Sequence, residues 1–159
     1  MTFIDKEPVK RVEKIIKQFD ENLSVSVLKT SARTALEAAS SLNCDVGAIV
    51  KSLLFKTDNK FCLFLIAGDK KASLKKIKKN IKFSDVSMAS ADEVKSITGY
   101  TIGGVSPVGH INDVDIYIDN SLERFNFLFA AAGHPNCIFK ISFLNLKKIT
   151  KGVIEDIIE

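Results

Sequence analysis

The sequence predicts a single α/β domain of the mixed α+β type, and three observations lead to this fold class. The chain has 159 residues, of which 46% are hydrophobic and 26% charged, a balance that suits one domain with its own core. Segments with helical periodicity are interspersed with segments that have the period-two pattern of strands. No repeat, low-complexity stretch or linker divides the chain. We therefore expect one domain over residues 1–159.

The helices are predicted from apolar spacing and capping residues. The first covers residues 8–19, with its proline suited to the first turn. A second is expected behind Ser31 as a possible N-cap, with alanines at helical spacing. A third, rich in lysine, follows Gly68-Asp69, and its apolar residues are expected to hold it on the core. Ser90-Ala91-Asp92-Glu93 matches a capping box for a fourth helix, which Gly99 ends. The apolar residues expected to hold the third helix are Leu74, Ile77 and Ile81.

Strands are predicted where apolar residues alternate with polar ones or run continuously between turn residues. The second and third are separated by the turn at Asp58-Asn59 and should form a hairpin. A mixed sheet is the simplest assembly. After the last strand, residues 144–157 indicate a last turn of helix and a partly frayed end. The predicted strands are residues 23–28, 49–56, 61–67, 113–119, 125–132 and 137–142.

Several protein classes are excluded by composition. No apolar run approaches the roughly 20 residues needed to span a bilayer, and residues 1–11 lack the apolar centre of a secretory signal. The three cysteines, Cys44, Cys62 and Cys137, are scattered and lie in mostly apolar surroundings. We expect them to be reduced core residues rather than disulfides. The sequence therefore predicts a cytoplasmic protein without a membrane partner.

A lysine interrupts the apolar run from Ile49 to Phe55. Because side chains alternate along a strand, Lys51 should share a face with Leu53 and Phe55, while Leu54 faces the other way. Such a lysine can extend its amine to the surface, since its long stem covers apolar area. It can also hold a phosphate or carboxylate in a pocket, where the anion would keep it charged. Both interpretations remain open at this point.

A glycine-rich segment closed by proline, Gly103-Gly104-Val105-Ser106-Pro107, follows the fourth predicted helix. Its backbone amides and carbonyls can face a reacting carbonyl or a water without any side-chain base. An ordinary tight turn explains the same residues equally simply. The segment follows a helix rather than opening one, so it is not a dinucleotide-binding fingerprint.

The turn Gly133-His134-Pro135-Asn136 displays an imidazole between two apolar strands. Histidine can contact a substrate amine, a hydroxyl or a water near neutral pH, although a histidine in a turn is often simply solvated. His134 with Cys137 is too small a set for zinc, which takes four ligands, or three and a water. Neither Cys62 nor Cys137 is marked as an exposed thiolate. We expect no metal and no cofactor.

The positive charge is unevenly distributed, because seven of the 13 residues from Lys70 to Lys82 are lysines although the net charge is only +4. Such a cluster can hold phosphates with salt-sensitive affinity and without reading bases. The alternative is a helix face that is simply solvated. Only a location near a site would favour the first interpretation.

Four segments in this order resemble one family: Ile49 to Phe55, Gly68-Asp69-Lys70-Lys71, Gly103 to Gly109, and Gly133-His134. They are similar to segments of the YbaK-type aminoacyl-tRNA deacylases and of the related editing domain inserted in bacterial prolyl-tRNA synthetase. The likeness runs from about Thr30 to Lys148. No synthetase domain flanks it here, so the resemblance implies a free-standing trans-editing enzyme. The implied fold is built on a mixed, strongly curved, barrel-like sheet flanked by helices.

The resemblance implies roles for single residues. Lys51 matches the family lysine that engages the 3' end of the tRNA, and Gly103 to Pro107 match the GXXXP loop, whose backbone positions the ester carbonyl, the terminal ribose hydroxyl or the water. His134 matches the histidine of the alanine-editing branch, which favours alanine as the amino acid removed. Ser52 departs from the asparagine or threonine of some members. The implied catalytic residues are Lys51, Gly103, Gly104, Val105, Ser106, Pro107 and His134.

This chemistry needs no catalytic triad. An aminoacyl ester is already activated, so its hydrolysis needs an oriented water, a stabilised oxyanion and exclusion of the larger cognate amino acid. We expect four residues near the lysine and the histidine to bind the substrate: Ser52, Leu53, Phe55 and Gly133. We expect four lysines of the cluster to contact tRNA: Lys70, Lys71, Lys75 and Lys78.

Two other functions stay open. A tRNA-end binding or regulatory module would bind mischarged tRNA and leave the ester intact, whereas a small-ester hydrolase with a backbone oxyanion hole would need no tRNA. The favoured substrate is alanine on the proline tRNA, with cysteine, serine, threonine and 2-aminobutyrate as alternatives. An aminoacyl-tRNA synthetase is a further candidate partner.

Overall fold

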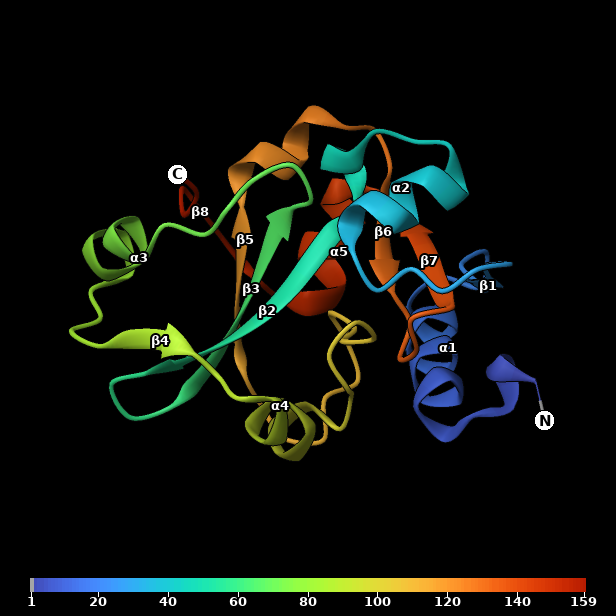
Figure 1. Ribbon diagram of the computed structural model, residues 1–159, viewed down its shortest axis with the longest axis horizontal. Coiled ribbons are helices and arrows are strands. Elements are labelled where there is room, and N and C mark those ends of the chain that lie inside the picture. The colour runs from blue at the N-terminus through green and yellow to red at the C-terminus, as the bar shows by residue number, and fades with distance from the viewer. Residues whose placement is uncertain (1) are drawn as a thin grey trace.

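Five α-helices and eight strands are described within residues 2–159 of the computed structural model, which confirms the mixed α+β class (Figure 1). The helices are α1 Glu7–Phe19, α2 Ala35–Leu42, α3 Leu74–Ile81, α4 Ala91–Thr98 and α5 Phe143–Thr150. The strands are β1 Val25–Val27, β2 Val50–Thr57, β3 Phe61–Ala67, β4 Val86–Met88, β5 Asp115–Asp119, β6 Leu128–Ala131, β7 Cys137–Ile141 and β8 Val153–Glu155.

The strands form two sheets. The larger has the order β4-β2-β3-β5-β8 and is mixed, because β4, β2 and β3 are antiparallel while β5 and β8 join in parallel. The smaller has the order β1-β7-β6 and is antiparallel. The predicted hairpin is confirmed, with β2 and β3 in register from Val50 opposite Ala67 to Lys56 opposite Phe61.

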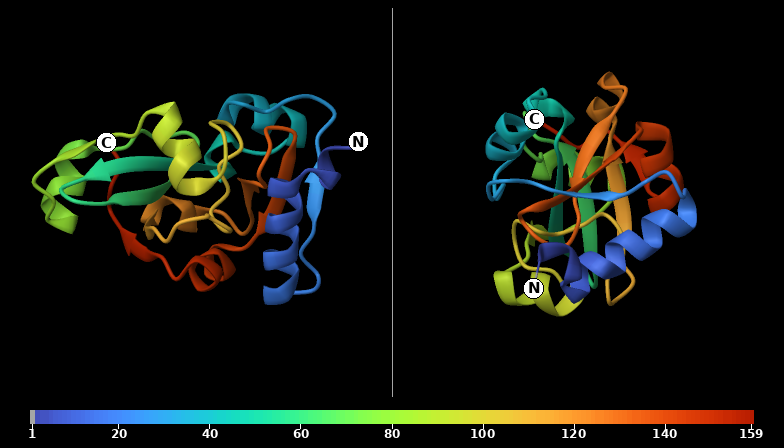
Figure 2. Two further views of the ribbon diagram at one scale, coloured as in Figure 1. Left: turned by 90° about the horizontal axis from the view of Figure 1, so that it is seen from below. Right: turned by 90° about the vertical axis from the view of Figure 1, so that its right-hand side faces the viewer.

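The expected barrel-like sheet is not closed. The two sheets are linked by a single parallel bridge between Ile49 and Phe129, where the chain enters β2 and passes β6. Figure 2 shows the resulting two-part arrangement, with α3 near one end of the molecule and α1 with β1 at the other. The strands at this junction therefore enclose space between the sheets instead of completing a ring of hydrogen bonds.

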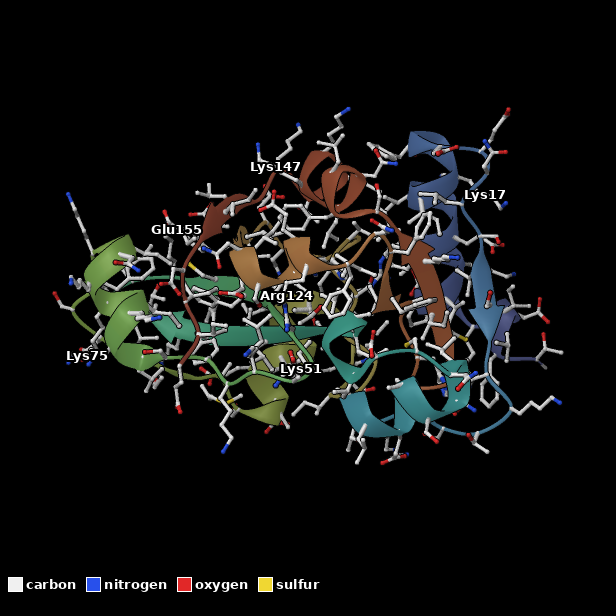
Figure 3. All side chains as sticks on the ribbon, turned by 90° about the horizontal axis from the view of Figure 1, so that it is seen from above. Lys17, Lys51, Lys75, Arg124, Lys147 and Glu155 are labelled. Atoms are coloured by element: carbon white, nitrogen blue, oxygen red, sulfur yellow. The ribbon has the colours of Figure 1, made fainter. Side chains whose placement is uncertain are left out.

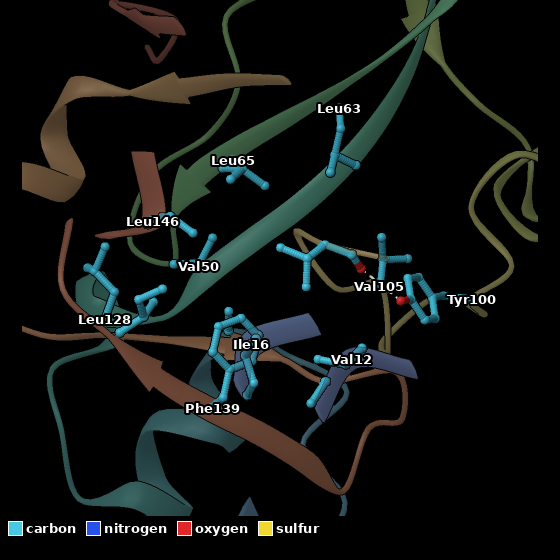
Figure 4. Packing of buried hydrophobic residues seen from close by; sticks show 14 of the residues in the cluster. Val12, Ile16, Val50, Leu63, Leu65, Tyr100, Val105, Leu128, Phe139 and Leu146 are labelled. Atoms are coloured by element: carbon cyan, nitrogen blue, oxygen red, sulfur yellow. Dashed lines mark hydrogen bonds between the residues drawn. The ribbon is translucent and has the colours of Figure 1, made fainter. Parts of the chain in front are cut away.

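The main core lies between the sheets (Figure 4). Val50 and Leu65 from the larger sheet meet Phe139 from the smaller one, and Val12 and Ile16 of α1 cover the same cluster. Of the apolar stripe predicted for the first helix, Val9, Val12 and Ile16 are fully buried, whereas Phe19, also predicted on it, is 38% exposed. Burial of each such side chain contributes roughly 1.5–3 kcal/mol.

One predicted helix start and one predicted core contact are wrong. The backbone of residues 28–32 pairs with the 135–136 turn, so α2 begins only at Ala35, and Thr34 rather than Ser31 caps it by accepting from the amide of Glu37. The lysine-rich helix α3 begins at Leu74 behind Ser73, and Leu74 is 43% exposed rather than held on the core. Ile77 is buried as expected.

The predicted frayed tail is also wrong. After α5 the chain turns at Lys151 and Gly152 into β8, which pairs in parallel with β5. Ile157 is then fully buried, and its carbonyl accepts from the amide of Ser73. The signal was missed because a three-residue strand is too short to show a period.

The fourth helix follows the prediction. Ser90 and Glu93 form the capping box of α4, and Gly99 ends it with a φ of 82°. This stop places the glycine-rich segment directly after the helix.

Candidate functional site

The amine of Lys51 is held at the edge of the larger sheet. Its Nζ donates to the backbone carbonyl of Lys70, at the turn that follows β3. Burial is the main reason that the pKa of Lys51 lies below its ordinary value; nearby Asp69 opposes this shift, and Lys71 adds to it. The amine is therefore partly desolvated and has both charge signs close by.

Asp69 is itself fixed by an ion pair. Its carboxylate accepts from Arg124, 2.8 Å away, and this hydrogen bond is the main reason that the pKa of Asp69 is lowered. Figure 3 shows Lys51 and Arg124 in the central part of the molecule. The pair ties the turn after β3 to the segment before β6, so the surroundings of Lys51 are fixed from two sides.

The glycine-rich loop and the histidine turn are in direct contact. The amide of Gly133 donates to the carbonyl of Gly104 at 3.0 Å. A Cβ on Gly104 would lie 2.9 Å from the Cα of His134, so any side chain there would force the two segments apart. Gly103 has a φ of 95°, which favours glycine. Two of the resembling segments, far apart in sequence, are thus brought together as expected.

The imidazole of His134, however, does not face the cavity described below. Its ring packs on Phe3, with centroids 4.4 Å apart, and Nδ1 accepts from the amide of Asn136 at 3.0 Å. Burial, with Lys6 and Arg33 nearby, lowers its pKa. Pro135, the next residue, lines the cavity instead. Lys51 and the loop thus meet at the cavity, whereas the imidazole expected to contact the substrate packs on Phe3 instead.

A cavity of about 330 Å³ lies between β2, α2 and the glycine-rich loop. Of the predicted site residues, five line it: Lys51, Ser52, Leu53, Gly103 and Val105. The others lie behind this lining or elsewhere. Ser106 is the fully buried residue of the loop, and Phe55 lies farther along β2, in the core cluster beneath α3. Predicted residues outside the lining are Phe55, Gly104, Ser106, Pro107, Gly133 and His134.

Phe55 was expected as a pocket wall, and this expectation is wrong. It is 2% exposed and packs edge-on against Phe64, with centroids 5.2 Å apart. It belongs to the core cluster around Ile77, beneath α3. Alternation correctly predicts that Phe55 and Lys51 share a face of the sheet. At Phe55 this face is covered by α3, whereas Lys51 lines the cavity.

Small residues that the sequence analysis did not assign to the site form much of the wall. They come from the segment before α2, from α2 itself, and from β6: Ala32, Ala35, Ala38, Ala130 and Ala131. The sequence indicates only that the alanines near residue 35 have helical spacing, which does not by itself point to a cavity wall. Arg33, Met88 and Ile102 also line the cavity, and Met88 and Ile102 are each 63% exposed. The inner wall is therefore formed by small apolar side chains, and the exposed residues Arg33, Met88 and Ile102 lie at its outer part.

Ser52 presents polar groups at this cavity. In the hairpin, the amide of Thr57 donates to Lys60, so every second residue from Thr57 back to Lys51 bonds to β3. Residues 50, 52 and 54 therefore direct their backbone groups to the opposite edge, and there Leu54 accepts from Ala89. β4 pairs only with Phe55–Thr57, so no strand pairs with Ser52 on that edge. Its hydroxyl is buried and has no partner within residues 2–159.

The lysine cluster divides into two parts. Lys70 and Lys71 flank the amine of Lys51, whereas Lys75 and Lys78 lie on α3. Figure 3 shows Lys75 at the far end of the molecule from α2, well away from Lys51. None of these four lysines lines the cavity. Lys70 and Lys71 are thus near the site as expected, and the α3 lysines extend away from it.

Other chemistries find little support. Within residues 2–159 no group of three His, Cys, Asp or Glu side chains is arranged to hold a metal ion. Burial raises the pKa of Cys44, Cys62 and Cys137 above the ordinary thiol value, so none is a ready thiolate. A separate question is membrane insertion: in the described part of the chain no helix is long and apolar enough to cross a membrane.

Comparisons with known proteins identify the family of the chain. The model of the aminoacyl-tRNA editing domain matches residues 29–149. The uncharacterized protein YwhH of Bacillus subtilis is 33% identical over 135 residues, which are 84% of this chain and 85% of that protein. The proline–tRNA ligase of Caldicellulosiruptor saccharolyticus is 33% identical over 91% of this chain, which spans only 24% of the ligase. A crystal structure of a candidate trans-editing enzyme for prolyl tRNA synthetase gives a TM-score of 0.90 at 33% identity, covering 97% and 98% of the two chains.

Proposed function

Because the chain belongs to the aminoacyl-tRNA editing domain family, and so to the aminoacyl-tRNA deacylases, we propose that it acts in trans on a tRNA of the proline system that carries the wrong small amino acid. Alanine is the favoured amino acid. The likeness to nearly the whole of a candidate trans-editing enzyme supports action in trans. The likeness to proline–tRNA ligases supports the choice of tRNA and a prolyl-tRNA synthetase as the partner that supplies the mischarged substrate.

The observation that carries the proposal is one cavity with Lys51 and the glycine-rich loop on its wall. Two recognition tasks meet there. A cation suits the phosphate of the tRNA 3' end, and an apolar cavity suits the aminoacyl group. An aminoacylated tRNA end has both groups, because its ester joins the aminoacyl group to a ribose that carries a phosphate.

Hydrolysis in this site rests on positioning and not on a strong nucleophile. The aminoacyl ester is activated, so a water held by backbone groups of the loop can attack its carbonyl, and amides near the developing oxyanion stabilise it. The elements positioned for this are Gly103 and Val105 on one side and the open edge of β2 at Ser52 on the other. The backbone carbonyl and hydroxyl of Ser52 can accept from the substrate ammonium group.

The alanine-rich wall supports the proposed selectivity for a small amino acid. A synthetase pocket separates near-isosteric side chains by only about 1–3 kcal/mol, so a second, smaller cavity must reject the larger cognate residue sterically. The wall formed by α2 and β6 leaves about 330 Å³ for the substrate end. The side chain of proline closes a ring on the α-nitrogen, so it would fill more of this space than the methyl group of alanine. Its ammonium group also has one hydrogen fewer to donate to Ser52.

The deciding experiment is a deacylation panel. The purified protein is offered one proline tRNA charged in turn with alanine, cysteine, serine, threonine, 2-aminobutyrate and proline, and ester loss is followed over time. We expect the alanyl ester to be hydrolysed fastest and the prolyl ester to stay intact. Binding of alanyl-tRNA without ester loss would select the non-hydrolytic module. Equal turnover of simple alanine esters without tRNA would select a small-ester hydrolase.

A further inference from the structure

The rear of the glycine-rich loop is held by side chains that the sequence analysis did not assign. The hydroxyl of Tyr100 donates to the carbonyl of Val108 at 2.7 Å, a bond drawn dashed in Figure 4. Nε of Arg11, from α1, donates to the carbonyl of Gly109 at 2.7 Å. Burial raises the pKa of Tyr100 to about 12, so its hydroxyl stays a donor. These contacts fix the residues that follow the loop.

His110 fixes the loop itself. Its Nε2 lies 2.7 Å from the carbonyl oxygen of Ser106, the loop residue before the closing proline. Because a carbonyl only accepts, Nε2 must carry the hydrogen. The ring is half-buried beside Tyr100, with centroids 6.0 Å apart. It lines a second, polar cleft of about 240 Å³ on the far side of the loop from the substrate cavity.

We infer that His110 is a positioning residue for ester hydrolysis, acting by holding the Ser106 carbonyl so that Gly103 and Val105 keep their place in the cavity wall. This inference rests on the proposed function. Val105 directly precedes Ser106, and Gly103 lies three residues before Ser106, which has no exposed surface. The Ser106 carbonyl lies in the peptide plane shared with Pro107, whose ring fixes φ, so this plane does not rotate freely on its own. Displacement of the carbonyl therefore shifts the Ser106 backbone, which is bonded directly to Val105. His110 would touch no substrate atom.

Two substitutions separate hydrogen bonding from shape. His110→Leu keeps a similar volume without a donor, whereas His110→Gln keeps an N–H near the position of Nε2. With mischarged tRNA at saturation, we expect kcat to fall at least tenfold in His110→Leu, with KM within about twofold, and to recover mostly in His110→Gln. Wild-type kcat in His110→Leu would overturn the inference, and so would equal loss in both variants.

A matched control removes the same kind of bond elsewhere. In Thr57→Val, a buried side-chain donor to a backbone carbonyl is lost at the hairpin turn. We expect this variant to melt at a lower temperature than wild type and to keep its kcat. A fall in kcat equal to that of His110→Leu would mean that general destabilisation explains both, and would overturn the inference.

A measurement on the unaltered protein covers the case in which His110→Leu does not fold. Nitrogen-15 NMR of the imidazoles, assigned with His110→Gln, reports which ring nitrogen carries the hydrogen. We expect Nε2–H for His110 at pH 7.5, and an Nδ1–H tautomer would overturn the inference. The result is independent of the deacylation panel, so failure of the proposed function and failure of the positioning role can be told apart.

Discussion

The two halves of β2 differ in what lies against their outer edge. At Phe55–Thr57 that edge is paired with β4, and the side chains are packed against Phe64 or bonded within the hairpin. Within residues 2–159 no strand of the larger sheet pairs with this edge at Ser52, and the cavity lies there instead. One continuous strand thus serves as framework at one end and as site at the other. Pairing, more than sequence composition, separates the two roles.

The largest effect that would sharpen this comparison is expected from two lysines on the same strand. Lys51→Ala should lower kcat/KM for mischarged tRNA at least 100-fold, because the cation at the open end is lost, while the melting temperature changes by only a few degrees. Lys56→Ala is the matched control at the paired end. It removes an exposed ion pair with Glu93, 3.6 Å long, and should leave turnover unchanged. Equal activities of the two variants would contradict the assigned role of Lys51.

The next effect concerns the α3 lysines, beyond the paired end. The double variant Lys75→Glu, Lys78→Glu should weaken tRNA binding about tenfold at 0.1 M salt. The slope of log Kd against log salt should fall by about one to two, because each phosphate contact contributes about 0.9 to that slope. Lys147→Glu, on α5, is the control and lies on another part of the surface (Figure 3). If the slope is the same in all three proteins, α3 is simply a solvated helix.

A smaller effect compares two hydroxyls of β2. Ser52→Ala removes a buried hydroxyl without a partner and should leave the free energy of unfolding equal or slightly higher, while KM rises about fivefold through loss of about 1 kcal/mol of substrate binding. Thr57→Val removes a bonded hydroxyl and should lower the free energy of unfolding by about 1 kcal/mol. Urea unfolding and steady-state kinetics check both. A destabilised Ser52→Ala would show that its hydroxyl has an internal partner.

The smallest expected effect is on the pH dependence of stability. Burial is the main cause that lowers the pKa of both His110 and His134, with Arg11 adding at the first and Lys6 and Arg33 at the second. The unfolded chain, with imidazole pKa values near 6.5, therefore binds more protons, and the free energy of unfolding falls as pH drops below about 7. Between pH 7.5 and 5.5 we expect the double variant His110→Gln, His134→Gln to lose less stability than wild type, by under about 1 kcal/mol. Parallel pH curves would contradict this.

Much of the fold could be predicted because its signals are local. The stripe of α1, the capping box of α4 and the β2–β3 hairpin depend on neighbours in sequence. The strand β8 and the two sheets could not be found, since parallel pairing of β8 with β5 joins distant residues and leaves no period in three residues.

The candidate site was predictable in part for the same reason. Lys51 and the glycine-rich loop were identified from resemblance and local pattern, and both line the cavity. The direction of the His134 ring depends on Phe3, and the role of His110 on a bond to Ser106, neither of which a motif encodes. The open edge at Ser52 follows only from the hairpin register together with the short length of β4.

The alanine-rich wall of the cavity has a consequence for the evolution of such a domain. Its methyl groups come from α2 and β6, and the backbones carrying them are fixed by other contacts. Exchange of one alanine for valine or glycine would resize the chamber while the hairpin and the loop stay in place. For the proposed deacylase, single replacements in this wall would therefore change which small amino acid is accepted, while Lys51 and the glycine-rich loop stay unchanged.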